Sequence, residues 1–268
     1  MADIEADGRT ARESASPQQG TSDSAGVPWA GRSFDAHPAV DDDGSAPVDL
    51  LDILTRFRSG DAVEASVVAV VRTSRLLVPL VARAGAIGTN LKGDKVDKSQ
   101  ELSIVTVSGP DGRNVLPVFT SVDAMSSWNP NARPVPVDAA RVALAAAAEG
   151  TDLVVVDPTS PTEFVLRRPA LAAIARSLPW TPCYLDDEVL DAFLAAADPE
   201  ESVVAVQLAP GDPDARLAGA ELLVHLSLRA GLDRGRLDAL MARLGQRWAE
   251  SPVIAERVDS LDVRLALT

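Results

Sequence analysis

The sequence contains few of the residues that most often carry catalysis or bind metal ions. Among its 268 residues there are one cysteine and two histidines. Because Cys183 is alone, a disulfide within the chain and a zinc site built from several cysteines are both excluded. His37 stands in a polar N-terminal stretch, and His225 stands among leucines in a segment that we predict to be a helix. We expect His225 to be a partly buried structural side chain rather than a catalytic base.

The short motifs of known catalytic and nucleotide-binding sites are also missing. The chain has no HExxH, no CxxC, no GxGxxG, no GxSxG and no GxxxxGK followed by Ser or Thr. Acidic residues are plentiful, so a hydrolase that works with two carboxylates stays open, although no spacing singles out a pair. We therefore expect no catalytic residue, no cofactor and no bound metal.

Positive charge and long apolar runs are scarce. Lys and Arg number 25 against 39 Asp and Glu, which gives a formal net charge of −14. A phosphate backbone or an anionic lipid surface needs a positive footprint, so neither nucleic acid nor a membrane is an expected partner. No apolar run reaches the roughly 18 residues of a membrane helix, and no basic segment followed by an apolar one begins the chain. We expect a cytoplasmic protein.

The composition divides the chain into four parts. Residues 1–46 are rich in Asp, Ser, Gly and Pro and lack a hydrophobic period, which predicts a disordered acidic tail. Residues 47–180 form the predicted N-terminal domain, 181–202 a connecting helix, and 203–268 a smaller C-terminal α+β domain. Aromatic residues make up 4% and hydrophobic residues 46% of the chain, so the core should consist mainly of Ala, Val and Leu.

Hydrophobic spacing and capping residues predict an α+β fold, a mixed sheet packed by helices. The predicted helices span 48–59, 61–71, 138–149, 169–178, 186–197, 213–230 and 233–248. The predicted strands span 75–82, 101–107, 114–119, 153–156, 163–166, 203–208 and 261–267.

Prolines and turn residues refine these predictions. Pro79 would place its strand at a sheet edge or at a bulge, because proline offers no N–H to a neighbouring strand. The two strands on either side of Pro110-Asp111-Gly112 are expected to form a hairpin. Three further prolines predict an irregular segment: Pro130, Pro134 and Pro136.

All the lysines of the chain lie in one loop, at Lys92, Lys95 and Lys98. This pattern has two interpretations. It can be an exposed site for an acidic partner or a phosphate, or it can be a solvated loop that Asp94 and Asp97 neutralise in part. We include the three lysines in a candidate interaction surface.

The segment Leu116–Ser121 (LPVFTS) also has two interpretations. In the first, Phe119 is a core side chain at a strand end, and Thr120 or Ser121 caps the next helix. In the second, the segment is a binding edge, where Pro117 removes a backbone donor and Phe119 lies at the rim of a groove. We therefore add Pro117, Phe119, Thr120 and Ser121 to the candidate interaction surface.

This segment resembles the Leu-Pro-x-Phe-Thr-Ser sequence of the SseB family. Other segments stand in the order found in actinobacterial members of that family: Arg75–Leu80, Glu101-Leu102, Trp128 and Leu153–Pro158. The resemblance covers 47–180, and 203–268 looks like the family's less uniform C-terminal region. It implies an α+β fold without established catalytic residues. The family name comes from an enhanced-serine-sensitivity phenotype. A secretion-system translocator has a similar name, but that role is not expected here because the chain has no membrane-inserting helix.

Two functions are consistent with these features. The first is a non-enzymatic protein-interaction or regulatory protein with an unidentified protein partner. The alternative is a small-ligand-binding module or an unrecognised enzyme, with a site near Leu116–Ser121 and Asp157. The sequence does not indicate an oligomeric state.

Overall fold

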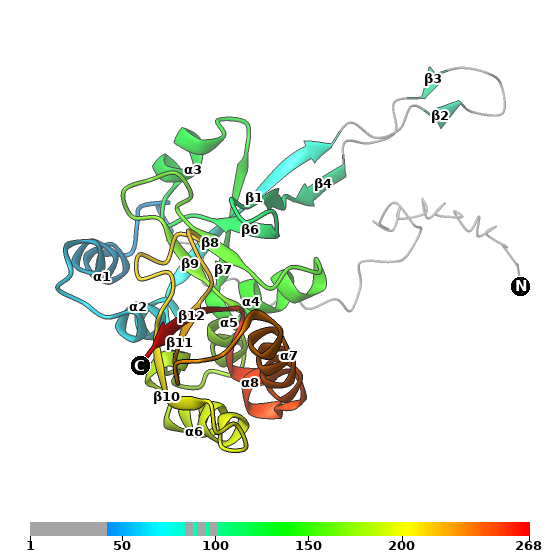
Figure 1. Ribbon diagram of the computed structural model, residues 1–268. Coiled ribbons are helices and arrows are strands. Elements are labelled where there is room, and N and C mark those ends of the chain that lie inside the picture. The colour runs from blue at the N-terminus through cyan, green and yellow to red at the C-terminus, as the bar shows by residue number, and fades with distance from the viewer. Residues whose placement is uncertain (1–41, 84–87, 90–94, 97–100) are drawn as a thin grey trace, which may run out of the picture. The chain divides into compact units, whose positions relative to one another are not determined.

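The computed structural model describes residues 42–83, 88–89, 95–96 and 101–268, and Asp42–Thr268 form one compact unit (Figure 1). Of the tail predicted for residues 1–46, residues 1–41 lie outside the described residues. The helices are α1 (Val48–Ser59), α2 (Glu64–Val71), α3 (Val122–Trp128), α4 (Ala139–Ala148), α5 (Arg168–Ala175), α6 (Asp187–Ala197), α7 (Arg234–Glu250) and α8 (Pro252–Arg257), with a 3-10 turn, η2, at Cys183–Leu185.

The strands complete an α+β fold, as expected. They are β1 (Arg75–Arg83), β2 (Gly88–Thr89), β3 (Lys95–Val96), β4 (Glu101–Ile104), β5 (Val107–Ser108), β6 (Asn114–Val118), β7 (Arg133–Asp138), β8 (Val154–Val156), β9 (Phe164–Leu166), β10 (Val203–Pro210), β11 (Leu222–Leu228) and β12 (Leu261–Leu267). Among the described residues, no helix is both long enough and apolar enough to cross a bilayer.

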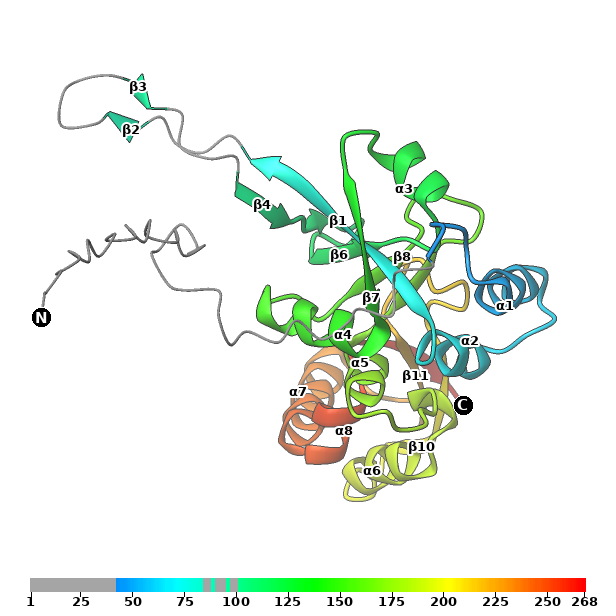
Figure 2. The same cartoon turned by 180° about the vertical axis from the view of Figure 1, so that it is seen from behind.

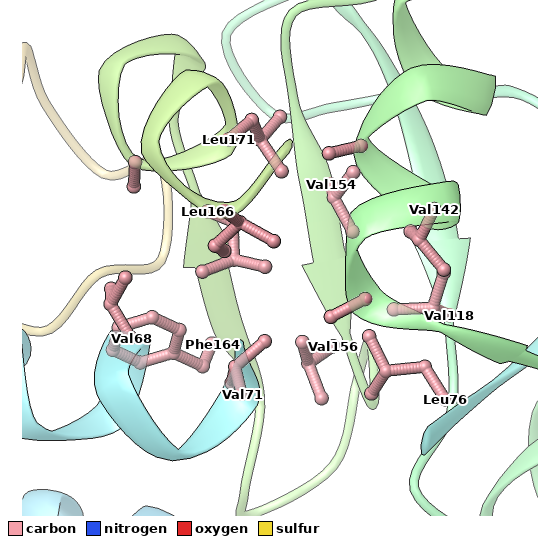
Figure 3. Packing of buried hydrophobic residues seen from close by; sticks show 14 of the residues in the cluster. Val68, Val71, Leu76, Val118, Val142, Val154, Val156, Phe164, Leu166 and Leu171 are labelled. Atoms are coloured by element: carbon pink, nitrogen blue, oxygen red, sulfur yellow. The ribbon is translucent and has the colours of Figure 1, made fainter. Parts of the chain in front are cut away.

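The N-terminal half contains a mixed sheet of order β5-β6-β8-β9, in which β6 and β8 run parallel. One face of this sheet packs on α1, α2, α4 and α5, and Figure 2 shows α4 beside α5 and α1 beside α2. Figure 3 shows the shared layer, where side chains of α2 face those of β8 and β9. The layer is mainly aliphatic, as the composition predicts. The labelled residues are Val68, Val71, Leu76, Val118, Val142, Val154, Val156, Phe164, Leu166 and Leu171.

The second N-terminal sheet corrects the prediction for Pro79, which lies in the central strand of the order β4-β1-β7. On one side of β1, Leu77 exchanges two backbone hydrogen bonds with Phe119, and pairing with β4 begins only at Leu80. Pro79 falls between these two partners, so its missing N–H leaves no ladder bond unmade. Pro134, opposite Pro79, belongs to β7, which is a regular edge strand and not the irregular segment predicted there.

The predicted hairpin is only partly present. β5 pairs with β6 through Val107 and Ser108, around a turn in which Gly112 has a φ of 82°. The residues Glu101–Ile104 pair instead with β1, so the predicted strand 101–107 is divided between two sheets. Antiparallel pairing with β1 depends on contacts that are distant in sequence, which a local alternation cannot reveal.

The helix predicted at 213–230 is wrong. Residues Leu222–Leu228 form β11, in which buried and half-buried side chains alternate along LLVHLSL. The run reads equally well as a leucine-rich helix, but β10 pairs with it antiparallel and β12 pairs with it parallel. The preceding residues 212–220 form a loop, which the Asp212 carboxylate holds by accepting hydrogen bonds from the N–H groups of Leu217 and Ala218.

One face of the C-terminal β10-β11-β12 sheet is covered by α6, α7 and α8. Phe193 of α6 and Trp248 of α7 lie 5.3 Å apart between ring centroids at its centre. Asp186 and Asp233 cap α6 and α7, each accepting from a backbone N–H of the first turn. The helix predicted at 61–71 begins later, at Glu64, without a side-chain cap.

Candidate functional site

The predicted segment at the end of β6 is a core and capping element. Pro117 is buried, Phe119 is 0% exposed and Thr120 is 2% exposed, and the Phe119 ring lies 5.3 Å from the ring of Trp128. The half-buried Ser121 caps α3 by accepting from the N–H of Ala124. The binding-edge interpretation is therefore wrong, because Pro117, Phe119 and Thr120 offer no side-chain surface to a partner.

Thr120 and Asp157 are in contact, as expected from the placement of the alternative site near Leu116–Ser121 and Asp157. Because β6 and β8 are parallel neighbours, their carboxyl ends share one edge of the sheet. The Asp157 carboxylate accepts from the N–H and the Oγ1 of Thr120, both at 2.8 Å, and from Thr162 Oγ1 at 3.2 Å. Burial raises the pKa of Asp157, and these three donors oppose that shift. These hydrogen bonds connect the 157–163 loop to the end of β6. Because Asp157 is 2% exposed, a substrate has no access to its carboxylate.

The lysines of the candidate surface are largely outside the described residues. Lys92 and Lys98 lie outside them, and of Lys95 only the backbone is described, paired with Thr89 in the β2-β3 ribbon. The interpretation of the lysine loop as an interaction site therefore stays a prediction. In the described part of the chain, no group of three or more His, Cys, Asp or Glu side chains is placed to hold a metal ion.

The outer face of the C-terminal sheet is a surface that the sequence did not indicate. It lies opposite the face that packs on α6, α7 and α8, and Figure 1 shows the three strands beside one another near the C-terminus. His225 lies at its centre, with Gln207 of β10 on one side and Arg264 of β12 on the other. The strand registers give three cross-strand rows, Ala209–Leu223–Asp262, Gln207–His225–Arg264 and Ala205–Ser227–Ala266.

The side chains of this outer face are accessible. The three from β11 are half-buried between their neighbours, and those from the flanking strands are exposed, apart from the half-buried Ala209. The face carries small, polar and apolar side chains with one acid and one arginine. If the sequence had predicted 222–228 as a strand, it would also have predicted this face, because residues at alternate positions of a strand share a face.

Two hollows lie elsewhere on the described part of the molecule. A hollow of about 510 Å³ is bordered by α7, α8 and the start of β12, with Met241, Trp248 and Leu261 among its lining residues. A second, of about 310 Å³, lies between α5, the segment 176–181 and α8. Both are large enough for a small ligand.

The comparison with family models covers the N-terminal half. Residues 50–173 match the family described as SseB protein N-terminal domain. The chain contains an SseB domain. The resemblance to the SseB family is thereby confirmed, and the C-terminal resemblance at 203–268 lies outside the match. No curated protein and no solved structure gave a match in the two other comparisons.

A buried ion-pair network joins the SseB domain to the C-terminal part. Arg167, at the end of β9 and 4% exposed, donates from Nη2 to Asp212 Oδ2 at 2.7 Å and to the carbonyl of Gly219 at 2.9 Å. Its Nη1 donates to Asp259 Oδ2 at 3.2 Å. Arg113 of the SseB domain donates to the same Asp259 carboxylate at 2.9 Å. Sequence reasoning missed this network because its partners are distant along the chain.

Two glutamates beside this network hold protons unusually tightly. Burial raises the pKa of Glu221 to about 7, although Glu221 accepts a hydrogen bond from the N–H of Asp259 at 2.6 Å. Burial also raises the pKa of Glu64, in the SseB domain, to about 7, and the Tyr184 hydroxyl donates to Glu64 at 3.3 Å. Cys183 is buried as well, and burial raises the pKa of its thiol. Glu64 and Glu221 can therefore change protonation near neutral pH, whereas Cys183 presents no reactive thiolate.

Proposed function

We propose that this SseB-family protein is a non-enzymatic, cytoplasmic protein-interaction or regulatory protein that binds a protein partner through the outer face of the β10-β11-β12 sheet. The observation that carries the proposal is the accessibility of that face, whose three cross-strand rows lie opposite the face of the sheet that packs on α6, α7 and α8. A half-covered antiparallel or mixed sheet is a rigid platform, because the helices behind it fix its strands.

The chemistry of the outer face favours a protein partner. Its exposed side chains are small or uncharged apart from Asp262 and Arg264, so a protein partner would bury few charges there, and few charges are found at the core of a protein interface. One arginine in three strands does not supply the positive stripe that nucleic acid requires, and the whole chain carries a net charge of −14.

The positions of the reactive side chains support a function without catalysis. Cys183 is buried with a raised thiol pKa, and the Asp157 carboxylate is occupied by three donors. His225 is in a β-strand, with Gln207 and Arg264 as its cross-strand neighbours. A general base must lie within reach of a substrate proton, and both Asp157 and Cys183 are buried, each 2% exposed.

Affinity capture from cells that express the full chain at its native level tests the proposal. Ala205→Arg places a long charged side chain on the outer face, and Ala147→Arg places the same side chain on an exposed position of α4. We expect a partner that is captured by the parent chain and by Ala147→Arg but lost with Ala205→Arg. A partner retained by Ala205→Arg, or no specific partner with the parent, would contradict the proposal.

The hollow beside α7 favours a second candidate function, a small-ligand-binding module. Its volume of about 510 Å³ and its largely apolar lining are typical of ligand sites. Gly245 lines it, and a Cβ added there meets no atom within 4 Å, so Gly245→Leu fills the hollow at little cost to packing. A thermal-shift screen supports this function only if a compound stabilises the parent and not Gly245→Leu.

A further inference from the structure

Among the described residues β12 is an edge strand of its sheet, and on its outer edge the N–H of Val263 donates only to the side chain of Asp262, at 3.2 Å from Oδ1. Ser260 accepts a bond from the N–H of Leu222, and Thr268 bonds to Leu228 and Ala230, so these two even-numbered residues face β11. In a regular parallel strand the direction of the backbone groups alternates. The N–H and C=O groups of Leu261, Val263, Leu265 and Leu267 therefore point away from β11, toward the edge.

The side chains along this edge are apolar on one face. Leu261, Val263, Leu265 and Leu267 share the face of β11 that packs on the helices, since each lies opposite a buried β11 residue. The helices cover only part of this row, because Leu265 is 44% and Leu267 is 73% exposed. The strand has neither lysine nor proline. Lysine and proline are two of the residues by which natural edge strands avoid pairing, so β12 lacks these two, and its charged residues are Asp262 and Arg264.

We propose that two copies of the chain pair through β12, antiparallel, about a two-fold axis at Val263. In this register Leu261 of each copy lies opposite Leu265 of the other, and Asp262 lies opposite Arg264. The segment Leu261–Leu265 (LDVRL) is thus complementary to itself, apolar against apolar and acid against base. A closed two-fold dimer requires such self-complementarity.

The backbone geometry strengthens the charge argument. Because the odd-numbered residues offer their backbone groups to the edge, Val263 and the Leu261–Leu265 pairs form the hydrogen-bonded pairs of the new ladder. Asp262 and Arg264 then form the non-hydrogen-bonded pairs, in which cross-strand side chains approach most closely. A register centred on Arg264 would instead place two arginines opposite each other, which disfavours it.

The pairing joins two β10-β11-β12 sheets into one and doubles the outer face proposed above as the partner-binding surface. Its biological role therefore rests on the proposed function, whereas the pairing itself rests on the edge of β12. Since one short strand pair buries less area than a standard stable interface, we expect a dimer that dissociates on dilution.

Sedimentation velocity of the full chain, over protein concentrations from about 1 to 200 µM, tests the pairing directly. The parent should shift from monomer to dimer across this range. Asp262→Arg and Arg264→Asp each place like charges opposite each other and should remain monomeric. The double variant with both changes restores the two ion pairs and should regain the dimer.

Two further variants separate pairing from folding and from net charge. Val263→Pro removes an N–H that bonds in the monomer only to the exposed Asp262 carboxylate and not to β11. This variant should stay monomeric with an unchanged circular dichroism spectrum. Asp191→Arg, an exposed change on α6, should dimerise like the parent. A parent that is monomeric throughout the range, or a double variant that is no more dimeric than the singles, overturns the proposal. If the parent is monomeric while the outer face still captures a partner, the proposed function stands without the dimer.

Discussion

Arg167 and Asp212 form a salt bridge of 2.7 Å between side chains that are 4% and 2% exposed. Arg167 belongs to the SseB domain, and Asp212 begins the loop that follows β10. The same guanidinium reaches Asp259, just before β12. One buried arginine therefore holds the end of β10 and the start of β12, which lie at the same end of the C-terminal sheet, against the SseB domain.

Removal of this arginine should be costly. Arg167→Ala leaves Asp212 and Asp259 short of their buried partner, and loss of one member of such a pair typically costs about 3–5 kcal/mol. Urea unfolding followed by circular dichroism measures the change. The matched control is Arg176→Ala, which removes a pair with Glu256 whose members are 63% and 67% exposed. The control should lose at most about 0.5 kcal/mol, and equal losses in the two variants would refute the role of Arg167.

Glu221 should make stability depend on pH in a predictable direction. Its pKa is raised to about 7 by burial, so the folded chain binds this proton more tightly than the unfolded chain does. Stability from this group is then greatest at low pH and falls as the pH rises from about 4.5 through 7.

Glu221→Gln removes that dependence and keeps an oxygen to accept from the N–H of Asp259. As the pH rises from 5 to 8, the free energy of unfolding of the variant relative to the parent should increase by on the order of 2 kcal/mol. Urea unfolding at the two pH values measures the difference, with the exposed Glu201→Gln as control. A difference between variant and parent that is the same at both pH values would show that Glu221 is not the titrating group.

The hydroxyl of Thr120 should matter more than its methyl group. Thr120→Val removes the donor to Asp157 Oδ2 and leaves a buried carboxylate with one partner fewer, at a cost of about 1–3 kcal/mol. Thr120→Ser keeps the hydroxyl and should cost less. Thermal unfolding of both variants provides the comparison, and a greater loss with serine than with valine would mean that packing dominates.

Cys183 should react with a thiol reagent only when the protein opens. The side chain is buried and its pKa is raised by burial, so little thiolate is exposed at neutral pH. Labelling in native buffer should be slow and should accelerate through the urea unfolding transition. Fast labelling without denaturant would show that the packing around η2 opens readily.

Local patterns predicted the elements that local forces determine. The helix α7 has both an acidic cap, Asp233, and an amphipathic period, and the sequence located it correctly. The buried run Leu153–Val156 was likewise correctly predicted as a strand. In each case the evidence lies within one element, so pairing partners are not needed to recognise it.

Features that depend on distant partners were not predictable in this way. The strand β11 resembles a leucine-rich helix until β12, which lies beyond two helices in the chain, pairs with it. Arg167 has no local signature, because its acidic partners are 45 and 92 residues away. The outer sheet face follows from β11, so the error in that strand concealed the candidate interaction surface as well.

Site-specific photo-crosslinking in cells tests the central claim most directly. A photoreactive residue replaces Gln207 on the outer face in one chain and the exposed Arg141 of α4 in the other. The account predicts a crosslink from position 207 to a protein partner that does not form from position 141. Equal crosslinking from both positions, or none from position 207 in cells where the chain is expressed at its native level, would contradict it.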